Sequence, residues 1–165
     1  MSYQEKRNTI LIISQLAFLA GYIFLALTRY RAGQLGPDDL KPWAAFILIA
    51  AAVSVVLMIV VQILFHIGLA VGTATRKGDA SEQEIEEELE ALSVEDEMDK
   101  FIGLKAGRAS SAAIGFGFLA ALVSLLLGAS HAIMINIIFL SGVLGMIAES
   151  ALAIIYYRRG LRHGY

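Results

Sequence analysis

The sequence predicts an all-α membrane protein: four transmembrane helices in an antiparallel bundle. Its 165 residues are 58% hydrophobic, with a mean hydropathy of +0.69, whereas an ordinary soluble domain is about 45–50% apolar. The apolar residues also gather into runs of roughly 20 or more, the length that crosses a hydrocarbon core of about 30 Å. Helices are the expected form, because lipid offers no water to satisfy an open backbone.

Four spans are predicted within one integral membrane domain, at about 9–28, 43–70, 109–128 and 133–157. The first has a longer apolar run than the core of a signal peptide, and no small-residue cleavage site follows it. The stretch from Pro42 to Thr75 would be about 50 Å long as a helix. We therefore expect the second span to tilt or to project from the membrane. The letters "GASHA" at 128–132 mark the turn between the third and fourth spans.

The positions of lysine and arginine predict the orientation. With the N-terminus inside, ten basic residues lie on the inner side and three, Arg29, Arg31 and Lys41, on the outer side. Because basic residues accumulate in cytoplasmic loops, we expect a multi-pass protein of the cell (inner) membrane with both termini in the cytoplasm. Trp43 then fits the outer interface, where aromatic side chains gather.

Composition and motifs argue against several classes of function. The chain has no cysteine, so disulfides and thiolate chemistry are excluded. No basic patch with interleaved aromatic residues occurs, so we expect no nucleic-acid partner. HExxH, GxSxG and Walker motifs are missing, and "GFGFLA" at 115–120 lies in a span and follows no strand. We therefore predict a protein that is not an enzyme and that uses no cofactor or metal.

Residues 73–108 form the one sizeable soluble segment, a cytoplasmic acidic loop. Eleven of the fifteen Asp and Glu residues lie in 79–99. Ser81 and Glu84 have the spacing of a capping box, which predicts a short cytoplasmic acidic helix at about 82–92. Its apolar residues form a narrow stripe that needs a covering surface. Residues 79–99 are therefore either a contact surface for a protein partner or a solvated acidic linker.

A second capping pattern precedes the third span. Ser93 and Asp96 have the same spacing, which predicts a helix that starts near Val94 and continues into the third span. The acidic motif, Asp96, Glu97 and Asp99, lies in its first turns. These side chains occupy neighbouring helical positions and point in different directions, so we interpret them as a charge run and not as a cation site.

Glu149 is the one formally charged residue between Arg108 and Arg158. A charged side chain at the centre of a span costs about 2.5–3.5 kcal/mol to insert, and such residues usually face the bundle and are paired. Other spans carry polar residues at a similar predicted depth. We therefore predict an intramembrane polar cluster of Gln15, Gln62, His66 and Glu149.

Two interpretations of this cluster stay open. In the structural one, Glu149 is protonated or hydrogen-bonded to Gln62 or His66 and fixes the helix register. In the functional one, His66 and Glu149 are in direct or water-bridged contact and exchange protons or line an ion path. The outer half offers only Tyr22 and Asn136 as polar candidates, so a path through one subunit would be incomplete.

Small residues recur every four positions on the third and fourth spans. Such seams let helix backbones approach closely. The helix-packing residues predicted from them are Gly107, Ser111, Gly115, Gly117, Ser141 and Gly145.

Three stretches, in order, resemble a family of uncharacterised prokaryotic four-helix small integral membrane proteins. They are "MSYQEK" before the first span, "DEMDK" before the third, and "HAIMINIIF" leading to "YYRRG". The family is a domain of unknown function with a D-E-R-D-like cytoplasmic motif, often encoded beside helix-turn-helix regulators. The resemblance implies a membrane location and four spans but no activity. Met98 stands where the relatives usually carry arginine.

Three functions fit these features. The first is a non-enzymatic inner-membrane helical bundle that self-associates in the lipid bilayer as a homo-oligomer, with the acidic helix as its interaction surface. The second is a small ion channel or proton-coupled transporter subunit that uses His66 and Glu149. The third is a sensor that binds a regulator through residues 79–99.

Overall fold

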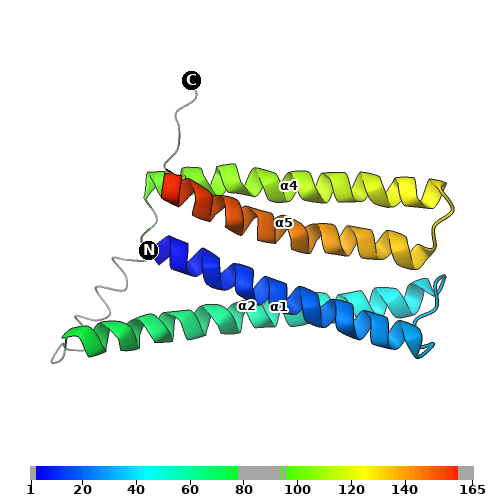
Figure 1. The fold of residues 1–165 in the computed structure, drawn as a ribbon, viewed down its shortest axis with the longest axis horizontal. Helices are drawn as coiled ribbons and strands as arrows, with labels where there is room; N and C mark the ends of the chain where they lie inside the picture. Colours follow the sequence, from blue (N-terminus) through cyan, green and yellow to red (C-terminus); the bar gives the residue numbers. More distant parts are fainter. Residues whose placement is uncertain (1–2, 78–93, 95, 160–165) are drawn as a thin grey trace, which may run out of the picture.

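The computed structural model describes residues 3–77, 94 and 96–159, and the described part is a bundle of four helices (Figure 1). These are α1 (Tyr3–Arg31), α2 (Leu40–Lys77), α4 (Glu97–Leu126) and α5 (His131–Arg159). All four are long and apolar enough to cross a membrane. The prediction of an all-α protein with four helices long and apolar enough to span a membrane is confirmed for the described residues. The predicted acidic helix at 82–92 lies outside the described residues.

The start of α4 differs from the prediction, because an aspartate pair caps the helix. The Asp96 carboxylate accepts a hydrogen bond from the backbone N–H of Asp99 at 2.6 Å, and the Asp99 carboxylate accepts one from the N–H of Asp96 at 3.3 Å. This reciprocal capping box satisfies two backbone donors and makes Asp96 the N-cap. The helix therefore starts at Glu97 and not near Val94, but it continues into the third span as predicted.

Two ends of the bundle can be distinguished. The loop end comprises the connections 32–39 and 127–130 together with the helix termini that they join. The terminal end comprises the other helix termini, near Tyr3, Lys77, Asp96 and Arg159. The two ends differ in which helices their buried clusters join: α1, α2 and α5 at the loop end, but α4 and α5 at the terminal end, where Ile102 and Ala106 are fully buried.

At the loop end, buried side chains and hydrogen bonds join α1, α2 and α5. Tyr22, Trp43 and Ala132 belong to one buried cluster. Trp43 Nε1 donates a hydrogen bond to the carbonyl of Gly36 at 2.9 Å, and the N–H of Ala132 donates to the carbonyl of Pro37 at 3.0 Å. The loop 32–39 is thereby bonded to two helices. Trp43 is only 5% exposed, so its side chain packs inside the protein, where its indole N–H finds a carbonyl.

The central helix is α5, which packs against each of the other three, and most extensively against α4. Two glycines allow this contact. A Cβ atom at Gly117 would overlap the side chain of Ser141, and one at Gly145 would lie 3.1 Å from the carbonyl oxygen of Ser110. By contrast, Gly115 is exposed, with nothing within 4 Å of where its Cβ would lie. Close approach of α4 and α5 therefore depends on Gly117 and Gly145.

Helix α2 packs less extensively than the others, on α1 and α5. Its 38 residues correspond to about 57 Å at 1.5 Å per residue, which exceeds a hydrocarbon core of about 30 Å. Figure 1 shows the Lys77 end of α2 far from α4 and α5. Large apolar side chains such as Leu48, Phe116 and Leu126 are exposed on α2 and α4. Such surfaces suit contact with lipid and would be unusual for a protein in water.

Candidate functional site

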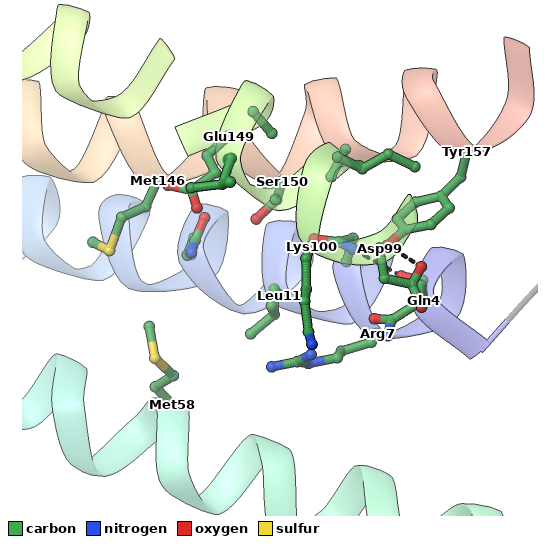
Figure 2. A pocket seen from close by; sticks show the side chains of 17 residues that line it. Gln4, Arg7, Leu11, Met58, Asp99, Lys100, Met146, Glu149, Ser150 and Tyr157 are labelled. Carbon is green, nitrogen blue, oxygen red and sulfur yellow. Dashed lines mark hydrogen bonds between the residues drawn. The ribbon is translucent and has the colours of Figure 1, made fainter. Parts of the chain in front are cut away.

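A cavity of about 690 Å³ lies at the terminal end, and residues of all four helices line it (Figure 2). Helix α2 contributes only Met58; the remainder comes from α1, α4 and α5. We name it the glutamate cavity. Its polar lining residues are Gln4, Arg7, Asn8, Gln15, Asp99, Lys100, Glu149, Ser150 and Tyr157.

Hydrogen bonds and ion pairs hold the outer part of the glutamate cavity in place. The Tyr157 hydroxyl donates to Asp99 Oδ1 at 2.7 Å, which links α5 to α4. Arg158 Nε lies 3.6 Å from Glu5 Oε1, which links α5 to α1. Lys100 is exposed beside this network, so the cavity reaches the surface at the terminal end. The outer part therefore has a polar, partly charged wall.

The inner part of the cavity holds Glu149 and Gln15. Glu149 lies eight residues before Tyr157, which is about 12 Å along α5, and Gln15 lies as far from Arg7 along α1. Figure 2 shows Glu149 beside Met146, further into the bundle than Asp99 and Lys100. A Cβ atom at Gly107 would lie 3.8 Å from Glu149 Oε1, so the glycine leaves room on α4 for the carboxylate.

Neither Glu149 nor Gln15 has a hydrogen-bond partner within the part of the chain that the structure describes. Among the described residues, Glu149 makes no hydrogen bond or ion pair, and the buried Gln15 Oε1 accepts no hydrogen bond. A buried polar atom without a partner is uncommon and costs about 1–3 kcal/mol. Two acceptors therefore line the deep part of the cavity with unused hydrogen-bonding capacity.

The structure brings two of the four predicted cluster residues to this cavity. Gln15 and Glu149 line it, whereas Gln62 and His66 of α2 are not among its lining residues. His66 is exposed, and its ring centroid lies 6.4 Å from that of Tyr3. The expected His66–Glu149 contact is not among the hydrogen bonds of the described residues. The reason is the course of α2, which presents Met58 to the cavity.

The remaining predicted residues have separate positions. In the acidic motif, Asp96 and Asp99 cap α4 and Glu97 is exposed. Of the small residues, Gly117, Ser141 and Gly145 lie in the α4–α5 contact, and Gly107 faces Glu149. Ser111 is exposed, and its hydroxyl donates to the carbonyl of Gly107 on its own helix at 3.2 Å.

A smaller cavity of about 230 Å³ adjoins the glutamate cavity and lies between α1, α2 and α5. The two share four lining residues, Leu11, Gln15, Met58 and Met146. Its other lining side chains are apolar except for Ser14 and Ser54. We name it the apolar cavity. Gln15 therefore lies at the boundary between the glutamate cavity and the apolar cavity.

An aromatic cluster lies between the apolar cavity and the loop end. Its rings are Phe18, Tyr22, Phe46 and Phe139, with the Tyr22 and Phe139 centroids 4.7 Å apart. The Tyr22 hydroxyl donates to Asn136 Oδ1 at 2.6 Å. Beyond it, a third cavity of about 300 Å³ is lined by Tyr22, Asn136 and Trp43. The route from the terminal end through the bundle thus meets packed rings joined by a hydrogen bond.

Sequence reasoning assigned no site role to Arg7, Lys100 or Tyr157, which line the cavity. Arg7 and Lys100 counted only among the basic residues of the inner side. One signal was present: Arg7 and Gln15 are eight residues apart, as are Glu149 and Tyr157. Such paired spacing predicts two polar layers at matching heights. No sequence signal indicated Met58.

Within the described residues, no three His, Asp or Glu side chains converge to hold a metal ion. The chain matches no protein-family model, and no curated protein or solved structure matches it. What the chain does is therefore inferred from the chemistry of its cavities.

Proposed function

We propose that the chain is a small, non-enzymatic ion channel or proton-coupled transporter subunit, in which Glu149 takes up and releases the proton. One observation carries this proposal: the Glu149 carboxylate lines a cavity and has no partner among the described residues. A glutamate that only fixed helix register would be expected to bond to a neighbouring helix. A carboxylate that faces an open cavity at membrane depth is instead suited to bind a proton or a cation that enters it.

The proposal uses Glu149 with Gln15 and leaves His66 out of the site. His66 is exposed on α2, beside Tyr3. Gln15 lines the cavity with Glu149 and has an unused acceptor. The proton-binding group and its nearest candidate partner therefore come from α5 and α1.

We place the protein in the cell (inner) membrane, with its helices crossing antiparallel and both termini in the cytoplasm. The excess of lysine and arginine at the terminal end supports this orientation. The glutamate cavity would then open toward the cytoplasm. Passage to the other side would require the rings of Tyr22 and Phe139 to separate and the Tyr22–Asn136 hydrogen bond to break.

Self-association is part of the proposal. Met58 is the single α2 residue in the glutamate cavity, so α2 covers little of it. A second copy would complete the enclosure, and the acidic segment 79–99 would provide a further contact surface. Such a segment would equally serve a cytoplasmic protein partner.

The second candidate function is a structural scaffold, a helical bundle that transports no ion or solute. The close α4–α5 contact at Gly117 and Gly145 and the hydrogen-bonded loop end favour it, because they describe a rigid unit. In this function Glu149 would take no part in transport.

Proton flux into liposomes separates the two candidates. The full chain is reconstituted with a pH-sensitive dye inside, and a potassium diffusion potential is imposed. We expect proton entry above that of empty vesicles, and its loss in Glu149→Gln. Glu97→Gln is the matched control, because it removes an exposed carboxylate outside the cavity. Proton entry no greater than into empty vesicles, or equal proton entry with Glu149→Gln, would contradict the transport proposal and favour the scaffold function.

A further inference from the structure

We infer that the two joined cavities bind an amphipathic organic amine, with the protonated amine at Glu149 and Gln15 and the apolar body in the apolar cavity. The inference deepens the proposed function, on which it rests for the movement of the ligand, by naming the class of substrate. It stands on the acceptor groups, the shape and the lining of the cavities.

The deep polar groups require a ligand that donates hydrogen bonds. Gln15 Oε1 is buried without a partner, and Glu149 offers a carboxylate with none among the described residues. An ammonium group carries up to three donors and a positive charge, and hydrogen bonds between charged groups are about twice as strong as neutral ones. An anionic ligand would place its own hydrogen-bond acceptors against the acceptor oxygens of Gln15 and Glu149, with no donor between them. The chemistry therefore selects a cationic donor.

The charge of the lining is arranged by depth. Arg7 and Lys100 belong to the outer part, where Asp99 also lies. Glu149 is the single formal charge of the inner part, about 12 Å further along α5 than Tyr157. A cation is thus most favoured beside Glu149 and not at the mouth of the cavity.

The apolar cavity accounts for the rest of the ligand. It begins at Gln15 and is lined by Phe18, Leu57 and Val143 among others. Met58 and Met146 line both cavities, and methionine adapts its shape to different apolar partners. A ligand with its amine at Gln15 would therefore direct a hydrocarbon or aromatic body between α1 and α2. Cavities of about 690 and 230 Å³ are large enough for such a molecule.

Binding of three isosteric probes tests the inference on the full chain in phosphatidylcholine nanodiscs. The probes are phenylbutylamine, phenylbutanol and phenylbutyrate, which share the apolar body and differ in the polar group. We expect saturable binding of radiolabelled phenylbutylamine after subtraction of empty nanodiscs. The alcohol and the carboxylate should compete at least about tenfold more weakly, because neither brings a charged donor to Glu149.

Two variants test the assigned positions. Glu149→Gln should weaken phenylbutylamine binding at least about tenfold, whereas Glu97→Gln should leave it unchanged. Ser54→Leu narrows only the apolar cavity, so it should weaken binding of phenylbutylamine several-fold while butylamine competes as before. Retention of the Trp43 fluorescence spectrum would show that each variant is folded.

Three outcomes would overturn the inference. They are phenylbutylamine binding no greater than to empty nanodiscs, competition by phenylbutanol as strong as by unlabelled phenylbutylamine, and unchanged phenylbutylamine affinity in Glu149→Gln. The proposed function fails separately. Amine binding without proton flux in liposomes would retain the binding site and remove transport. Proton flux without amine binding would retain transport and remove the amine.

Discussion

The substitution Gly117→Ala tests how closely α4 and α5 pack. The added methyl group would overlap both Cβ and Oγ of Ser141. The Ser141 hydroxyl could rotate away only by losing its hydrogen bond to the carbonyl of Ile138, at 2.8 Å. Its Cβ cannot rotate away, because it is fixed to the backbone. The helices must therefore separate locally, and the variant should be less stable.

The expected magnitude follows from a matched pair of variants. Overpacking of this kind costs about 1–3 kcal/mol, whereas replacing glycine by alanine in a helix gains about 0.5–1 kcal/mol. Gly115→Ala, two positions away on the same helix, meets nothing within 4 Å and should show only the gain. The difference between the two variants cancels the helix propensity. It should therefore equal the overpacking cost of about 1–3 kcal/mol.

Unfolding in mixed micelles titrated with a denaturing detergent measures this difference. Trp43 is the single tryptophan and is buried at the loop end, so its fluorescence reports loss of tertiary packing. The double variant Gly117→Ala with Ser141→Gly removes the colliding atoms and should recover most of the lost stability, a non-additivity of about 0.5–3 kcal/mol. Equal free energies of unfolding for Gly117→Ala and Gly115→Ala would refute the close contact.

Two further predictions use other parts of the chain. Tyr22→Phe removes the hydrogen bond to Asn136 and should lower the free energy of unfolding by about 0.6 kcal/mol, the average for such bonds in bilayers, and by no more than about 1.7 kcal/mol. The same titration measures the change, and unchanged stability would contradict the prediction. A fluorescent protein fused to the C-terminus should be bright and alkaline phosphatase fused there inactive, because the C-terminus is proposed to be cytoplasmic; an active phosphatase would reverse the orientation.

The sequence predicted the helices well because their signal is local. A run of apolar residues without charge demands a helix in lipid, whatever surrounds it. The same reasoning placed Gln15 and Glu149 at one depth, because depth follows from counting residues from Arg7 and Arg158. Both residues line the glutamate cavity.

Which residues face one another was less predictable, because it depends on how each helix is rotated and where it diverges. Gln62 and His66 have a suitable depth, but α2 presents Met58 to the cavity. Gly115 and Gly117 fit the same small-residue pattern, yet only Gly117 meets α5. The spacing of residues shows which of them share a face of one helix. Which helix packs against that face depends on the packing of the whole bundle.

The uneven packing of the two ends has a mechanical consequence. At the loop end, the Trp43–Gly36, Ala132–Pro37 and Tyr22–Asn136 hydrogen bonds connect α1, α2 and α5. At the terminal end, α2 lies apart from α4 and α5 (Figure 1), and Gln15 and Glu149 have no partner among the described residues of the cavity there. Elements with few packed contacts move at the lowest free-energy cost. Movement of α2 should therefore pivot about its hydrogen-bonded contacts at the loop end, with the Lys77 end of the helix moving furthest.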